Sequence, residues 1–276
     1  MEILIAKSAG FCFGVKRAIN MATDCAEVSD GEISTLGPII HNPQVVDKLD
    51  KESNIKITES VEDMKSGTII LRSHGAKLSE RKTAEKKGLK VLDATCPFVK
   101  KTQEFVSELT ADGYTVIVVG EKEHPEVRGI VSYGKEEIIV AASVGELEGL
   151  SQCSKIGIVA QTTQSQENLQ AITAYCVPKA KEIKVFNTIC SATSVRQKES
   201  VELSKLVDSM IVVGGKNSAN TRRMADICRS IQPKTYHIET ADEIEESWFV
   251  GINRLGVTAG ASTPNWIIEE VIERVS

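Results

Sequence analysis

The sequence predicts an α/β protein made of three similar α/β units, here called repeats, around a pseudo-threefold axis. Three related segments, 8–18, 93–103 and 187–197, each place a cysteine directly before a helix-like stretch. A predicted strand ending in glycine follows each cysteine at a distance of 25, 24 and 24 residues. Ordinary alternation of strands and helices explains such matched distances poorly, so we interpret them as an internal repeat.

In the first repeat, apolar residues after Cys12 recur at helical spacing, which predicts a helix. These residues are Val15, Ala18, Ile19 and Ala22. The segment 32–37 then predicts a strand that ends at Gly37. The segment 68–75 predicts a second strand, whose polar loop contains His74.

In the second repeat, Pro97 follows Cys96 and suits the first turn of a helix. Apolar residues continue this helix on one predicted face, namely Phe98, Phe105 and Leu109. The segments 114–120 and 156–163 are rich in Val and Ile and predict two strands. The second of these strands ends in a polar loop at Thr162.

In the third repeat, a helix is expected after Cys190, and the segments 209–215 and 255–262 predict strands. From Ser262 through both chain ends to Cys12 is 26 residues, compared with 22 and 28 at the corresponding places in the other repeats. We therefore expect the N-terminal segment to complete the third repeat. The expected domains are 13–95, 96–189, and 190–276 together with 1–12.

Composition excludes several classes of protein. The chain has 276 residues and a net charge of −5, whereas a nucleic-acid-binding protein would need a basic face. The longest apolar run, 138–142, is too short to cross a membrane. The N-terminus shows no signal peptide, so we expect a cytoplasmic protein with neither nucleic-acid nor membrane partners.

Three cysteines at matching places predict a metal site with three thiolate ligands: Cys12, Cys96 and Cys190. A helix N-terminus favours the thiolate form, and thiolates select zinc or an iron–sulfur cluster. Structural zinc normally takes a fourth protein ligand, whereas a cluster held by three cysteines leaves one iron open to substrate. The other cysteines are expected to be small buried residues. They are Cys25, Cys153, Cys176 and Cys228.

Polar residues occupy the loops that follow the predicted strands. They are His41, His74, His124, Glu126, Thr162, Ser218, Asn220 and Ser262. Imidazole, hydroxyl and amide donors at helix N-termini predict an anion site, which suits a phosphate-bearing substrate. Glu126 is the only carboxylate in this set, and proton donation is the role that suits it beside an anion. His237 lies outside the set and is expected at the surface.

Nine ordered motifs extend over almost the whole chain: GFCFGVKRA, HNPQVV, SHG, DATCPFVKKTQ, HPEVRG, QTTQS, NTICSATSVRQ, GGKNSANTRR and GVTAGAS. This set resembles the family of 4-hydroxy-3-methylbut-2-enyl diphosphate reductases, iron–sulfur oxidoreductases of the methylerythritol phosphate route of isoprenoid biosynthesis. The resemblance implies a trefoil of three α/β units around a [4Fe–4S] cluster with one iron open to the substrate. It also implies a reductive dehydration that yields isopentenyl diphosphate and dimethylallyl diphosphate.

The resemblance assigns roles to individual residues. Cys12, Cys96 and Cys190 would ligate the cluster. The diphosphate would be held by His41, His74, His124, Ser218, Asn220 and Ser262. Glu126 would deliver protons, Thr162 would orient Glu126 or the substrate hydroxyl, and His124 and Thr162 would serve both catalysis and binding. A ferredoxin- or flavodoxin-like electron donor is expected. Ala219 and Ser191 depart from some family members, which have Ser and Tyr there.

Two other functions compete with this one. The first is another enzyme of the same architecture, since quinolinate synthase also resembles a three-unit trefoil that holds a cluster through three cysteines. Carboxylate substrates such as that enzyme's usually require arginine clamps, whereas the loops here offer His, Ser, Thr and Asn. The second alternative is a non-enzymatic iron–sulfur sensor, which would need a surface for an effector.

Overall fold

The structure is a computed structural model that describes residues 1–29, 31–135 and 137–276. The strands are β1 (Glu2–Ile5), β2 (Ile33–Leu36), β3 (Ile55–Thr58), β4 (Thr68–Leu71), β5 (Lys90–Asp93), β6 (Thr115–Val119), β7 (Ile139–Ala141), β8 (Cys153–Ala160), β9 (Ala180–Val185), β10 (Ser209–Val213), β11 (Thr235–Ile238) and β12 (Arg254–Ala259). The α-helices are α1 (Phe13–Val28), α2 (Pro43–Ser53), α3 (Leu78–Lys86), α4 (Pro97–Ala111), α5 (Pro125–Val131), α6 (Gln166–Cys176), α7 (Ser191–Ser204), α8 (Ala219–Ile231) and α9 (Asn265–Val275). Short 3₁₀ helices are η1 (Val61–Asp63), η2 (Val144–Leu147), η3 (Val177–Lys179), η4 (Ala241–Glu243) and η5 (Glu246–Phe249).

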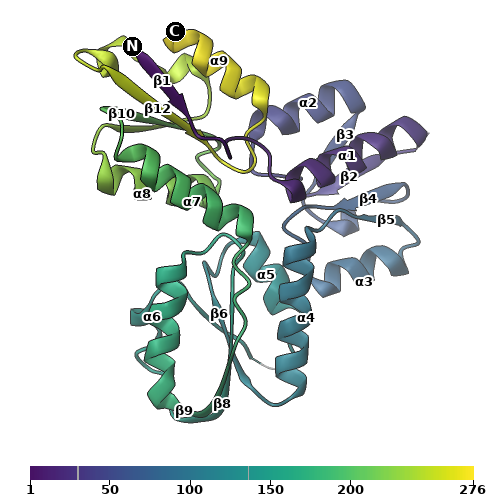
Figure 1. The fold of residues 1–276 in the computed structure, drawn as a ribbon. Coiled ribbons are helices and arrows are strands. Elements are labelled where there is room, and N and C mark those ends of the chain that lie inside the picture. The colour runs from purple at the N-terminus through teal and green to yellow at the C-terminus, as the bar shows by residue number, and fades with distance from the viewer. Residues whose placement is uncertain (30, 136) are drawn as a thin grey trace. The chain divides into compact units, whose positions relative to one another are not determined.

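These strands form three parallel four-stranded sheets with the same internal order. The orders are β3-β2-β4-β5, β7-β6-β8-β9 and β11-β10-β12-β1. The N-terminal strand β1 therefore occupies the place that β5 and β9 have in the other sheets. It pairs with β12 from Glu2 opposite Arg254 to Ile5 opposite Val257, and Figure 1 shows the two strands side by side. The predicted α/β fold with three repeats is confirmed.

Contacts within the chain define two compact units. Unit 1 comprises Met1–Lys16, Ile40–Lys48 and Ser191–Ser276, and unit 2 comprises Arg17–Ile39 and Leu49–Cys190. Unit 1 contains the sheet with β1, and unit 2 contains the other two sheets. The domain boundaries expected from the sequence stay a prediction.

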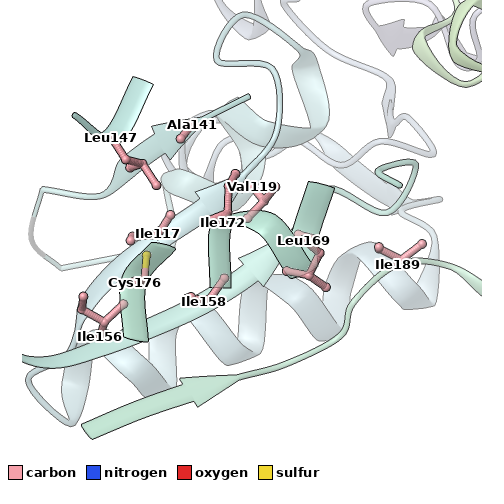
Figure 2. Packing of buried hydrophobic residues seen from close by; sticks show 11 residues of the cluster. Ile117, Val119, Ala141, Leu147, Ile156, Ile158, Leu169, Ile172, Cys176 and Ile189 are labelled. Atoms are coloured by element: carbon pink, nitrogen blue, oxygen red, sulfur yellow. The ribbon is translucent and has the colours of Figure 1, made fainter. Parts of the chain in front are cut away.

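Strand β6, inside the sheet of β7, β6, β8 and β9, is buried on both faces, which explains its continuous apolar sequence. Neighbouring residues of a strand point to opposite faces. Ile117 and Val119 of β6 pack in one cluster with residues of α6 (Figure 2). Val116 and Val118 pack in a second cluster with residues of α4 and α5. An interior strand of a parallel sheet that is covered on both faces needs apolar side chains at successive positions, whereas the edge strand β9 keeps exposed lysine and glutamate side chains.

Helix α4 begins where the sequence predicts, and two of the three residues of its predicted apolar face, Phe105 and Leu109, pack against the core, but Phe98 does not. Cys96 is its N-cap residue and Pro97 its first residue. Phe98 is 44% exposed, because the buried face of α4 contains Val99 and Val106 instead. Adjacent helical residues are rotated by about 100°, so Phe98 points away from this face.

Three of the four remaining cysteines are buried as predicted, namely Cys25, Cys176 and Cys228. Burial raises the pKa of the Cys176 and Cys228 thiols. The prediction is wrong for Cys153, which is only partly buried at the first position of β8. Its Sγ lies 3.4 Å from the Ser151 carbonyl oxygen. None of the described helices is long and apolar enough to cross a membrane.

Candidate functional site

The three predicted cluster cysteines share one backbone arrangement. Each directly precedes a helix and donates its amide N–H to the carbonyl two residues beyond a strand: Cys12 to Ala261 at 3.1 Å, Cys96 to Ser73 at 2.9 Å, and Cys190 to Thr162 at 2.9 Å. All three thiols are partly exposed and in no disulfide. Among the described residues no three His, Cys, Asp or Glu side chains gather as metal ligands, so the ligand set stays a prediction.

These hydrogen bonds correct the register between repeats. The carbonyls that accept from the three cysteines belong to equivalent residues, so Thr162 is equivalent to Ser73 and Ala261. The residue equivalent to His74 and Ser262 is therefore the next one along the chain. That residue is Thr163. A second set of bonds agrees, each joining the fourth residue beyond a strand to the first: Gly75 to Arg72 at 2.9 Å, Gln164 to Gln161 at 2.9 Å, and Thr263 to Gly260 at 3.0 Å. Sequence spacing missed the one-residue shift because both positions are threonine.

Glu126 and Thr162 form a buried pair in unit 2. Glu126 is 1% exposed and Thr162 is 6% exposed. The Thr162 backbone N–H donates to Oε1 of Glu126 at 2.6 Å, and its hydroxyl donates to Oε2 at 2.9 Å. Two donors from one residue hold the carboxyl group in a single orientation. Because the Thr162 carbonyl accepts from Cys190, the same residue connects the carboxyl group to a predicted ligand loop.

Two predicted histidines lie beside this pair. His124 is the N-cap residue of α5, and its Nδ1 accepts the Glu126 backbone N–H at 3.2 Å. Nδ1 is therefore unprotonated, and a neutral ring carries its proton on Nε2. The rings of His74 and His124 meet edge to face, with centroids 5.7 Å apart and planes at 81°. Unit 2 thus brings together His74, His124, Glu126 and Thr162.

Unit 1 brings together the other polar residues of the predicted set. Ser218 is the N-cap residue of α8 and accepts the Thr221 backbone N–H at 3.3 Å. Asn220 is 7% exposed, and its Nδ2 has no hydrogen-bond partner among the described residues. The Ser262 hydroxyl donates to the His41 carbonyl oxygen at 3.1 Å. Donors gathered at a helix N-terminus suit an anion, so the placement of Asn220 and Ser218 agrees with the predicted anion site, which stays a prediction.

The loop before α8 also needs glycine for steric reasons. A Cβ atom on Gly215 would lie 2.6 Å from the carbonyl oxygen of His41. Any side chain at this position would therefore push the His41 loop away from the start of α8.

Asn42 caps a helix next to the predicted site residue His41, and the spacing argument missed this cap. Its Oδ1 accepts the Val45 backbone N–H at 2.9 Å, so Asn42 caps α2. His41 precedes the cap, whereas His124 and Ser218 are caps themselves. The signal was present, because Asn followed by Pro43 is typical of a helix start.

His237 is not the surface residue expected from the sequence. Its ring is partly buried and donates from Nε2 to the Gly214 carbonyl oxygen at 2.8 Å. Burial lowers the pKa of His237. Gly214 has a φ of +145°, so the imidazole supports a turn that favours glycine.

Comparison with known proteins gives consistent matches along the chain. Residues 3–276 match the family described as LytB protein. The chain is 56% identical over 275 residues to the 4-hydroxy-3-methylbut-2-enyl diphosphate reductase of Trichlorobacter lovleyi, covering 100% of this chain and 98% of that protein. It is also 56% identical to the Geobacter sulfurreducens protein of the same name, covering 100% of this chain and 97% of that protein.

Two solved structures are also similar. One is the structure of (E)-4-hydroxy-3-methyl-but-2-enyl diphosphate reductase, the terminal enzyme of the non-mevalonate pathway. It has a TM-score of 0.74 and 47% identity, covering 100% of this chain and 99% of that one. The other is the E-1-hydroxy-2-methyl-but-2-enyl-4-diphosphate reductase of Plasmodium falciparum. It has a TM-score of 0.93 and 27% identity, covering 99% of this chain and 87% of that one.

Proposed function

Because this chain belongs to the LytB family, we propose that it reduces 4-hydroxy-3-methylbut-2-enyl diphosphate to isopentenyl diphosphate and dimethylallyl diphosphate. The names of its relatives support this activity over a quinolinate-synthase-like enzyme or a sensor. The structural observation that carries the proposal is the buried Glu126 carboxyl group held by two donors of Thr162.

In this proposal Cys12, Cys96 and Cys190 hold a [4Fe–4S] cluster. Their chemistry fits the group, because the three cysteines are partly exposed, directly precede helices and can supply the thiolate ligands that an iron–sulfur cluster prefers. When bound, the cluster supplies electrons and a Lewis-acidic iron for the allylic C–O bond. The electrons come from a ferredoxin- or flavodoxin-like donor. The cytoplasmic location also stays a prediction.

The diphosphate is bound by amide, hydroxyl, imidazole and backbone N–H donors. Asn220 supplies its buried Nδ2, and Ser218 supplies a hydroxyl at the start of α8. His41, His74, His124 and Ser262 supply the other contacts. Ala219 is the first residue of α8, and its backbone N–H takes the place of a serine hydroxyl as a donor.

Glu126 donates the protons that the reaction consumes. Thr162 holds the carboxyl group through both oxygen atoms, so the acid does not turn away from the substrate. His124 fixes the first turn of the helix that carries Glu126. General acids held in this way contribute through position as well as acidity.

The decisive experiment is anaerobic purification, iron and sulfide analysis, and a single-turnover assay with the hydroxylated diphosphate. The expected result is about four irons per chain and release of both products. A parallel assay uses dihydroxyacetone phosphate and iminoaspartate. Turnover of these two compounds, or cluster binding without reduction of the diphosphate, would overturn the proposal.

A further inference from the structure

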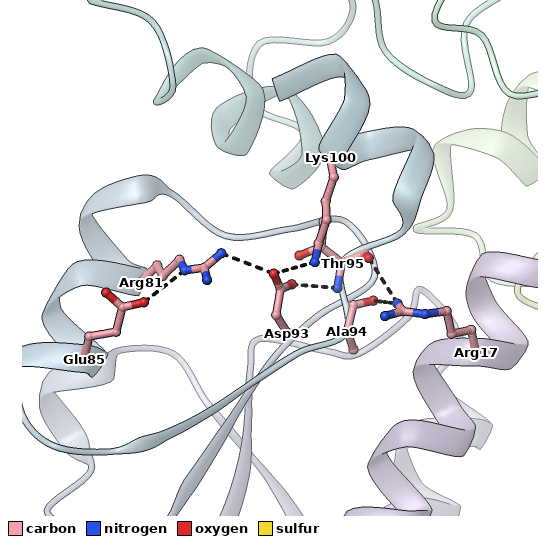
Figure 3. A network of polar contacts seen from close by, with 7 residues as sticks. All are labelled: Arg17, Arg81, Glu85, Asp93, Ala94, Thr95 and Lys100. Carbon is pink, nitrogen blue, oxygen red and sulfur yellow. Dashed lines mark hydrogen bonds and ion pairs between the residues drawn. The ribbon is translucent and has the colours of Figure 1, made fainter. Parts of the chain in front are cut away.

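The loop before Cys96 is held by charged side chains from three helices (Figure 3). Arg17 of α1 donates from Nη1 to the carbonyl oxygens of Ala94 and Thr95, at 3.5 and 3.2 Å. Asp93, at the end of β5, accepts the Thr95 backbone N–H at 3.0 Å. Its other carboxylate oxygen contacts Lys100 Nζ at 2.7 Å and Arg81 Nη1 at 3.3 Å. These contacts together fix residues 93–95.

A second arginine makes the matching contact in unit 1. Arg196 of α7 is 6% exposed, and its Nη2 donates to the Gly10 carbonyl oxygen at 2.8 Å. Its Nη1 donates to Ala192 in its own helix at 3.1 Å. Gly10 lies two residues before Cys12, as Ala94 lies two residues before Cys96.

We propose that Arg17 and Arg196 are positioning residues, each fixing the backbone that presents the cysteine of the next repeat. Arg17 follows Cys12 and orients Cys96, whereas Arg196 follows Cys190 and orients Cys12. The inference rests on the proposed function in one respect, since it treats these cysteines as cluster ligands.

The guanidinium group suits this task for two physical reasons. Its planar fork offers several N–H donors at once, so one side chain can bridge two backbone carbonyls. Both arginines also act over long separations in sequence, 78 residues for Arg17 to Thr95 and 186 residues for Arg196 to Gly10. The position of one cysteine therefore depends on the helix that follows a different cysteine in the sequence.

Hydrogen exchange of the anaerobically purified, cluster-loaded protein tests the proposal. Arg17→Gln should accelerate exchange of the Thr95 and Cys96 amides by about tenfold and leave the Cys12 amide unchanged. Arg196→Gln should have the reverse effect. Lys16→Gln is the matched control, because Lys16 is an exposed neighbour on α1, and it should change neither loop.

A crossed pattern of this kind distinguishes positioning from general loss of stability. Equal acceleration at both loops, or no change at either, would overturn the inference. Arg17→Lys and Arg196→Lys keep the charge without the planar fork, and should show the same crossed pattern if the glutamine variants do not fold.

The glutamine variants of both arginines should also lose iron to a chelator faster than Lys16→Gln. A wild-type protein without iron would overturn the proposed function instead, while the exchange pattern would still decide the role of the arginines.

Discussion

At the scale of single residues, the role proposed for Glu126 depends on the groups that surround its carboxyl group. Replacement Glu126→Gln should preserve shape, because the amide oxygen can accept the Thr162 N–H while the amide nitrogen donates to the hydroxyl. The amide is not an acid at neutral pH, so turnover should fall by about two to four decades.

Substrate binding should survive this change, since the diphosphate donors remain. The measurement pairs ligand affinity with single-turnover rate on one anaerobic sample. A near-wild-type rate for Glu126→Gln would show that another group or a water donates the proton.

Asn220 should act on binding rather than chemistry. Asn220→Ala removes a buried amide donor. We expect a loss of about 1.5–3 kcal/mol, or roughly one to two decades in substrate affinity, at unchanged iron content. Ala219→Ser, one residue earlier on α8, is the control and should be tolerated. Unchanged affinity in Asn220→Ala would place the anion site elsewhere.

At the scale of elements, Asp93 joins β5 to α3 and α4 through Arg81 and Lys100. Burial acts to raise the pKa of Asp93, but hydrogen bonds from Lys100 and Thr95 outweigh it and lower the pKa. The lowered pKa stabilises the fold above the unfolded-state value of about 3.9. This contribution is lost as the pH falls through the native pKa.

Asp93→Asn should therefore lower the free energy of unfolding by about 1–2 kcal/mol at pH 7. The difference from wild type should shrink as the pH falls below about 4. Urea denaturation at several pH values measures it. Asp112→Asn is the control, because Asp112 forms an exposed ion pair with Lys184 and should change stability little. A deficit for Asp93→Asn that persists at low pH would contradict the electrostatic explanation.

At the scale of the whole molecule, the threefold repeat predicts which of the seven cysteines are needed for the cluster. The Ser variants of Cys12, Cys96 and Cys190 should each lose the cluster and nearly all activity, because Ser is a harder and more basic ligand. Iron analysis and visible absorption measure the loss. Ser variants of Cys25, Cys153, Cys176 and Cys228 are the controls and should retain their iron. Full cluster content in Cys96→Ser would contradict the assignment.

The sequence by itself determined the α/β class, the threefold repeat and the family of this protein. Apolar runs such as β6 and β10 and the start of α4 at Pro97 depend on neighbours within one element. Local spacing therefore predicts them. The matched distances from cysteine to glycine were equally visible, because each repeat has nearly the same length.

Tertiary structure alone decided which loop residues meet. The Glu126–Thr162 pair joins residues 36 positions apart, and the Arg17 contact to Thr95 joins residues 78 positions apart. It also decided that Thr163, not Thr162, corresponds to His74. Such contacts depend on the register of parallel strands and on how helices pack across a sheet. Spacing along the chain does not encode either quantity, because a shift of one residue in a loop leaves the apolar pattern of both neighbouring elements unchanged.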